Sequence, residues 1–205
     1  MRSTYRRRTL YKRKKLGGDK MKKIILCIVG LIAFGFIIFY GYLTIQVNMA
    51  VSNVKNSIYA GNITDIPMSS KNFMQTTRNE YFDNVWKNIK ITNPPVLPVF
   101  NNATVKFTIT APDMYSKIMS FLELDISEIT ADDVNKSCLE YANNPDAPRI
   151  ETVIEIKMHK ENGKWVLDIE NFDFLNAITG NSAKAYQEMY KKAIDEIREN
   201  IRGEE

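Results

Sequence analysis

The apolar and polar positions of this chain divide it into segments of different character. The longest apolar run, from Ile24 to Val47, contains no Asp, Glu, Lys or Arg. As a helix rising about 1.5 Å per residue it would be roughly 36 Å long, enough to cross a hydrocarbon core of about 30 Å. Aromatic residues, which favour the level of the lipid headgroups, gather toward its far end: Phe36, Phe39, Tyr40 and Tyr42. We therefore predict a transmembrane helix over residues 24–47.

Charge is distributed unevenly around this run. Residues 1–23 hold eleven of the 28 Lys and Arg residues and one acidic residue, Asp19. Residues 48–205 hold the other 17 basic residues against 23 acidic ones, a net charge of −6 that the overall +4 conceals. Positively charged flanks stay in the cytoplasm. We therefore expect a basic cytoplasmic tail over 1–23 and a single-pass protein of the cell membrane with residues 48–205 outside the cytoplasm.

Cleavage of the run as a signal peptide would instead give a secreted soluble protein. The apolar region of a signal peptide spans about 7–15 residues, which is shorter than this run. The best small-residue position for cleavage is Ala50, but Asn48 at the minus-three position is unfavourable. Lipidation of Cys27 is disfavoured because Leu26 precedes it and Lys23 lies only four residues away. We expect an uncleaved anchor and keep the secreted form as an alternative.

Met1 and Met21 are both candidates for the start of the protein. The stretch LGGDKM at 16–21 can be encoded with GGA-GGT, a bacterial ribosome-binding sequence, shortly before the ATG of Met21. Residues 1–20 would then be untranslated upstream sequence, and the codons of Gly17 and Gly18 decide the matter. If residues 1–20 are translated, the tail is a polybasic segment that is attracted to anionic lipid. We prefer this interpretation to nucleic-acid binding.

Beyond the run, we predict a stalk and linker over 48–69 and a folded domain over 70–205. Apolar residues in 49–58 suggest a helical stalk. A four-residue apolar spacing predicts a helix from about 70 to 90. NPPVLP at 93–98 is incompatible with a helix or an interior strand and predicts an extended loop.

Alternation and capping residues predict the next elements. Over 103–112, Val105, Phe107 and Ile109 share one face of a strand. Asp113 can cap a short helix after it, and TADD at 130–133 resembles a capping box that opens another.

The strongest local signal is the hairpin ETVIEIKMHKENGKWVLDIE. Asn162-Gly163 is the dipeptide of a type I′ turn, in which both central residues take positive φ. A two-residue loop pairs Glu161 with Lys164, Met158 with Leu167 and Ile156 with Ile169. This register gathers the apolar residues of both strands on one face.

The chain closes with a short turn or helix at 171–180 and a helix that we expect Ser182 to cap. One side of this last helix is apolar and includes Tyr186, Met189, Tyr190 and Ile197. Most amphipathic helices cover a core with such a side, so packing on the domain's own sheet is the simplest interpretation. Aromatic residues and Met are also enriched at interfaces. These four residues are therefore our candidate partner-contact site.

Two or three antiparallel strands with helices before, between and after them predict an α+β domain behind one transmembrane helix. The element order and the motif ENGKWVLDI resemble the NTF2-like and cystatin-like extracytoplasmic domains of bacterial single-pass membrane proteins. An N-terminal anchor followed by such a domain also resembles assembly-scaffold subunits of conjugative secretion systems. The resemblance implies a binding or scaffold role in a cell-envelope or secretion assembly.

Few residues suggest chemistry. His159, the single histidine, is expected to be a solvated strand residue, and Cys138 a small core residue on an apolar helix stripe. No Gly-rich phosphate loop or serine-nucleophile elbow occurs. We therefore expect no catalytic residue, metal or cofactor; an NTF2-like enzyme using acidic residues is the alternative. The expected partners are the lipid bilayer and other membrane or envelope proteins or a second copy of the chain, and not nucleic acid.

Overall fold

The computed structural model of the chain describes the backbone of residues 3–68, 80–123, 130–168 and 172–203. Within these ranges, side chains at 3–20, 80–81, 131, 193, 196–197 and 199–203 lie outside the description. The chain separates into two compact units, residues 1–45 and 46–205. The fold is α+β, as predicted, with a four-stranded antiparallel sheet and several helices in the second unit.

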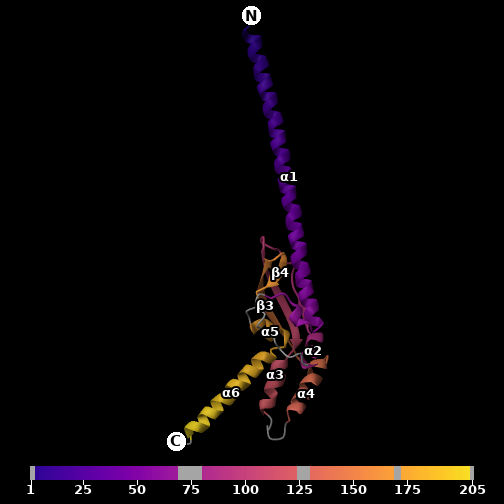
Figure 1. Ribbon diagram of the computed structural model, residues 1–205, viewed down its shortest axis with the longest axis vertical. Coiled ribbons are helices and arrows are strands. Elements are labelled where there is room, and N and C mark those ends of the chain that lie inside the picture. The colour runs from indigo at the N-terminus through magenta and orange to yellow at the C-terminus, as the bar shows by residue number, and fades with distance from the viewer. Residues whose placement is uncertain (1–2, 69–79, 124–129, 169–171, 204–205) are drawn as a thin grey trace. The chain divides into compact units, whose positions relative to one another are not determined.

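The first unit is the greater part of one long helix, α1 (Ser3–Tyr59; Figure 1). The predicted apolar helix over 24–47 lies entirely within it. Over Met21–Tyr59, α1 is long and apolar enough to cross a membrane by length and composition.

The last turns of α1 belong to the second unit, where they form one wall of its core. Val47, Val51, Val54 and Ile58 recur every three or four residues and are no more than 1% exposed. Gly61, at φ 72°, then ends the helix. We predicted 48–69 as a stalk before a domain starting at residue 70. The helix is there, but its apolar side is buried and the compact unit begins at Gln46.

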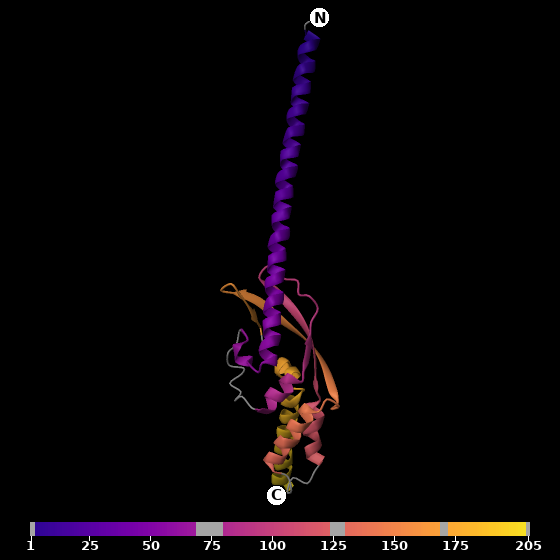
Figure 2. The ribbon, with the colours of Figure 1, turned by 90° about the vertical axis from the view of Figure 1, so that its right-hand side faces the viewer.

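The sheet has the order β1-β2-β3-β4, and every neighbouring pair is antiparallel. Its long strands are curved (Figure 2). Its strands are β1 (Lys90–Thr92), β2 (Asn102–Pro112), β3 (Arg149–Glu161) and β4 (Lys164–Leu167). Val105, Phe107 and Ile109 of β2 are buried, which confirms the predicted alternation. The short edge strand β1 begins at Lys90, where the predicted helix was to end, and the sequence did not predict it.

The hairpin between β3 and β4 has the predicted turn and register. Asn162 and Gly163 have φ values of 50° and 81°, and Glu161 pairs with Lys164. The predicted pair of Met158 with Leu167 is also present. Ile169, the expected partner of Ile156, lies outside the described residues.

Helices connect and flank these strands: 3-10 helix η1 (Ile63–Asp65), α2 (Glu80–Lys87), α3 (Met114–Met119), 3-10 helix η3 (Ser120–Glu123), α4 (Ala131–Asn143), α5 (Phe172–Ile178) and α6 (Ser182–Gly203). Asp113 caps α3 by accepting a hydrogen bond from the Ser116 N–H at 3.1 Å. Thr130 and Asp133 form the predicted capping box of α4. The predicted helix over 70–90 corresponds to the shorter α2, and residues 69–79 are not described.

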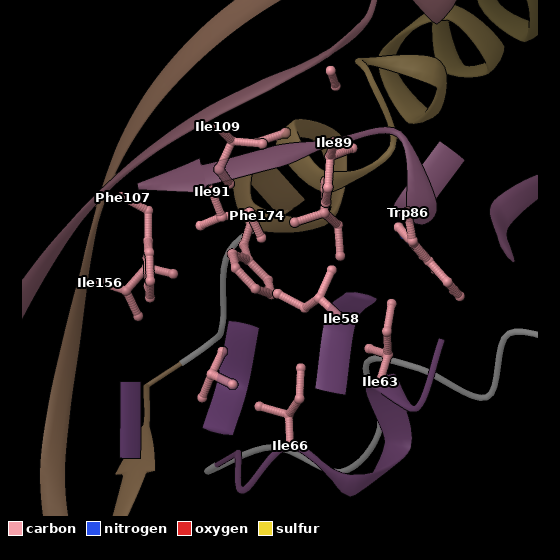
Figure 3. Packing of buried hydrophobic residues seen from close by; sticks show 14 of the residues in the cluster. Ile58, Ile63, Ile66, Trp86, Ile89, Ile91, Phe107, Ile109, Ile156 and Phe174 are labelled. Carbon is pink, nitrogen blue, oxygen red and sulfur yellow. The ribbon is translucent and has the colours of Figure 1, made fainter. Parts of the chain in front are cut away.

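The core lies where α1, α5 and the inner face of the sheet meet (Figure 3). Ile58 of α1 points toward Phe174 of α5, and Phe107 of β2 packs near the same ring, with centroids 6.4 Å apart. Ile156 of β3 extends this cluster, and Trp86 of α2 covers its other side. This arrangement explains why the C-terminal turns of α1 are apolar on one side: without them the sheet would expose its inner face.

Candidate interaction surfaces

Helix α6 carries the four residues that we predicted as a contact site, and the preceding loop fixes where it starts. Gly180 and Asn181 both have positive φ, 60° and 63°, so the chain turns sharply after α5. The predicted cap, Ser182, is instead the first residue of the helix, and its buried Oγ has no hydrogen-bond partner in the described part of the chain. The amide oxygen of Asn176 accepts the Lys184 N–H at 2.9 Å. A residue of α5 thus caps α6 from outside the helix.

The first two turns of α6 are docked on the domain. Ala185 is fully buried, and the Tyr115 hydroxyl of α3 donates a 2.5 Å hydrogen bond to Glu188. That bond to a carboxylate is the main cause that raises the pKa of Tyr115 above its usual value. The Lys184 ammonium lies 5.3 Å from the centre of the same tyrosine ring. The helix therefore packs on α3, whereas the sequence suggested packing on the sheet as the simplest alternative to partner docking.

The four predicted contact residues do not share one environment. Met189 is half-buried and packs against the core. Tyr186 and Tyr190, one turn apart, are 48% and 71% exposed. Ile197 lies on α6, but its side chain is outside the described part. Two exposed tyrosines therefore form the described part of this surface, which we call the α6 tyrosine pair.

A second exposed apolar surface lies in the loop between β1 and β2, where the sequence analysis predicted only an extended segment. Leu97, Val99 and Phe100 are 71%, 63% and 67% exposed. A signal was present in the sequence: NPPVLPVFNN, residues 93–102, carries no charge and places these apolar residues among prolines. We call Leu97, Val99 and Phe100 the loop triad.

The residues most suited to chemistry are engaged in structural contacts. His159 Nδ1 lies 2.6 Å from Asp168 Oδ1, and its Nε2 lies 3.8 Å from Glu161. We predicted a solvated residue, but its side chain is 35% exposed and paired with Asp168. This happens because Asp168 continues the register of the hairpin, its N–H donating to the Lys157 carbonyl at 2.8 Å, and so lies diagonally opposite His159 on the same face of the sheet. The ring nitrogens thus face two carboxylates, and such a set lacks the nucleophile that a base would activate.

Cys138 is only 2% exposed on α4, as the apolar stripe predicted. Burial raises the pKa of its thiol and outweighs the nearby positive charge of Lys117, which acts in the opposite direction. The thiolate is the reactive form of cysteine, so this residue is suited to packing rather than to nucleophilic attack. Among the residues that the structure describes, no group of three or more His, Cys, Asp or Glu side chains is placed to hold a metal ion.

Comparison with known proteins adds little to this description. No protein-family model and no curated protein matches the chain. Among solved structures, the chain is similar to a Bacillus subtilis protein described as a "putative lipoprotein (ycdA)", with 17% sequence identity and a TM-score of 0.30. The match covers 65% of this chain and 46% of the other, so it spans less than half of that protein's length. No NTF2-like or cystatin-like family is found, and the resemblance suggested by the hairpin motif stays an expectation.

Proposed function

We propose that this chain is a non-catalytic, single-pass membrane protein whose 46–205 unit acts outside the cytoplasm as a binding or scaffold domain. One observation carries the proposal. The apolar run and one wall of the domain core are parts of the same helix, α1, and the core residues begin at Val47, where the run ends. The apolar run and the folded domain are therefore contiguous in the chain, with no linker between them, as an uncleaved anchor requires.

This continuity favours an uncleaved anchor over secretion. Cleavage near Ala50 would separate Val47 from Val51, Val54 and Ile58 and would break α1 inside the core. Removing a buried aliphatic residue from a packed core costs on the order of 2–5 kcal/mol, a large part of the stability of an ordinary domain. Mass spectrometry of the mature protein separates the alternatives, because the secreted form would begin near residue 51.

The orientation rests on charge. Lys22 and Lys23 precede the apolar run, whereas the first charged residue after it is Lys55 and the whole 48–205 segment is acidic. Basic flanks are retained in the cytoplasm, so the domain would be exported. The test is a Val153→Cys variant in a Cys27→Ser background, treated with a membrane-impermeant maleimide on intact, wall-stripped cells; Val153 is 50% exposed and belongs to neither proposed contact surface. Labelling is expected, and labelling only after lysis would contradict the orientation.

Two observations support a contact function: the inner face of the hairpin is apolar, and two tyrosine side chains of α6 are exposed to solvent. An NTF2-like enzyme would need carboxylates on the inner face of its sheet, but Ile154, Ile156, Met158 and Leu167 occupy the described inner positions of the hairpin. The α6 tyrosine pair is an exposed surface of the type that interfaces favour. We propose that it contacts another envelope protein or a second copy of this chain.

Substitution tests this contact better than truncation, because removing α6 would also remove buried Ala185 and the Glu188 bond to Tyr115. The variant is Tyr186→Ser with Tyr190→Ser, and the matched control is Val153→Ser, which removes a 50% exposed apolar side chain from β3. The proposal predicts that crosslinked complexes disappear from membranes carrying the tyrosine variant and persist in the control. Equal crosslinking in both would contradict it.

A further inference from the structure

The loop triad lies on a segment that is held by hydrogen bonds on both sides. The side-chain amide of Asn48 makes two hydrogen bonds to the backbone of Val96, accepting its N–H at 3.0 Å and donating to its carbonyl at 2.9 Å. At the other end, the Lys160 N–H donates to the Asn101 carbonyl at 2.8 Å. The triad therefore has a fixed position on the 46–205 unit.

That position is next to the end of the apolar run. Asn48 directly follows Val47, the last residue of the run, and holds the loop through Val96. Lys160 Nζ donates to Gln46 Oε1 at 2.8 Å, so β3 is also joined to this first turn of the domain. If the run crosses the bilayer as proposed, the residues that hold the loop lie at the boundary between lipid and water.

The loop turns its apolar residues away from the domain. Val96 and Pro98 are buried, whereas Leu97 and Val99 between and after them are exposed. Val99 and Asn102 form a two-residue hairpin with reciprocal backbone bonds of 2.7 and 3.0 Å. Phe100, the first residue of its turn, has φ 53°, a conformation that bulky residues seldom adopt. A turn that suits Gly or Asn thus presents an exposed Phe ring.

We propose that Leu97, Val99 and Phe100 insert into the outer lipid surface beside the anchor and hold the domain against the membrane. This proposal rests on the membrane anchoring proposed above. Apolar and aromatic side chains settle at the boundary between headgroups and acyl chains. Lipid fits better than a protein partner, because the loop is joined to the residue that follows the membrane run. The absence of charge over 93–102 removes the desolvation cost that Lys or Glu would bring to this site.

The test uses the full chain in phosphatidylcholine vesicles with a polarity-sensitive fluorophore on single introduced cysteines. Leu97→Cys and Phe100→Cys are labelled in a Cys27→Ser background, and buried Cys138 is left in place. Val153→Cys is the control, since Val153 is an apolar residue that is 50% exposed and belongs to neither proposed contact surface. Quenching by lipids brominated in the acyl chain and by aqueous iodide is measured at each site. Tryptophan emission checks that each variant is folded.

We expect blue-shifted emission, quenching by brominated lipid and loss of iodide quenching at positions 97 and 100. Position 153 should show the reverse. Iodide quenching without lipid quenching at 97 and 100 would overturn the proposal. Protection from both quenchers would also overturn it, because self-association rather than lipid would then cover the loop. The maleimide test at position 153 in cells reports independently on the anchored topology, so failure of the loop proposal is distinguishable from failure of the proposed function.

Discussion

Gly180, at the junction between α5 and α6, gives the sharpest test of the packing described here. Its φ is +60°, and a Cβ added to it would lie 2.1 Å from the Pro112 carbonyl oxygen and 3.1 Å from Cγ of Met114. The first contact is with backbone, which cannot rotate away as a flexible side chain could. The junction is also bonded to α3, because the Tyr115 N–H donates to the Gly180 carbonyl at 3.1 Å. Gly180→Ala must therefore displace the end of β2, the junction or both.

The expected cost has two parts, and Gly163 separates them. An L-residue at positive φ costs roughly 1–2 kcal/mol, and overpacking a tight site costs roughly another 1–3 kcal/mol. Gly163 has φ +81° but no atom within 4 Å of the added Cβ. Gly163→Ala should therefore cost only the first part, about 1–2 kcal/mol, and Gly180→Ala about 2–5 kcal/mol. For a domain of this size, each kcal/mol lowers Tm by about 2–4 °C.

The assay is urea denaturation of the detergent-solubilised full chain, followed by tryptophan fluorescence. Both tryptophans, Trp86 and Trp165, are buried in the 46–205 unit, at 6% and 4% exposed, so their emission reports its unfolding. The midpoint should fall further for Gly180→Ala than for Gly163→Ala, with the same slope. Equal midpoints for the two variants would refute the close approach of Gly180 to Pro112.

Three further predictions concern the core, a capping box and a cap supplied by another helix. Ile58→Ala should destabilise the domain by about 2–5 kcal/mol because it opens a cavity in the core. Met49→Ala, at a 61% exposed position on the same helix, should change the free energy of unfolding by less than about 0.5 kcal/mol. Equal effects of the two variants in urea denaturation would mean that this part of α1 is a free stalk. Hydrogen bonds from the hydroxyl and, second, the backbone N–H of Thr130 lower the pKa of Asp133 in the folded protein below its ordinary value of 3.8. The Asp133 carboxylate therefore contributes its full stabilisation above the ordinary pKa of the unfolded chain, and this stabilisation is lost as pH falls through the lower pKa of the folded state. Asp133→Asn should flatten the acid limb of a stability profile measured from neutral pH downward, and an unchanged limb would count against the capping box. Asn176→Ala should cost about 1 kcal/mol, as for loss of an ordinary N-cap, with reduced amide-exchange protection at the start of α6; unaltered protection there would disprove capping by α5.

The parts of the fold that could be predicted from sequence depend on residues close together in the chain. Asn162-Gly163 determines its own turn, because few other dipeptides accept positive φ at both positions. Thr130 and Asp133 satisfy each other's backbone groups across one helical turn. The alternation over β2 identifies its buried face. The length of the apolar run likewise follows from composition alone.

The tertiary structure decided where each apolar surface goes. The spacing of Val51, Val54 and Ile58 is the same for a stalk and for a core helix. These side chains are buried because the inner face of the sheet and Phe174 lie against them. Ser182 is not the cap of α6, because Asn176 reaches the helix end from α5.

In the candidate contact surfaces, too, neighbouring residues in the chain do not decide which side chains are exposed. The sequence marks Tyr186, Met189 and Tyr190 as equals, but docking of α6 on α3 buries Met189 in part and leaves the tyrosines exposed. The loop triad is exposed because Asn48 and Lys160, both more than 40 residues away, fix the loop. Turns and caps are determined by neighbouring residues, whereas burial depends on which distant segments pack together. For that reason the sequence alone determined the long apolar helix, the hairpin and the caps of α3 and α4, and only the tertiary structure decided which apolar residues remain available for contact.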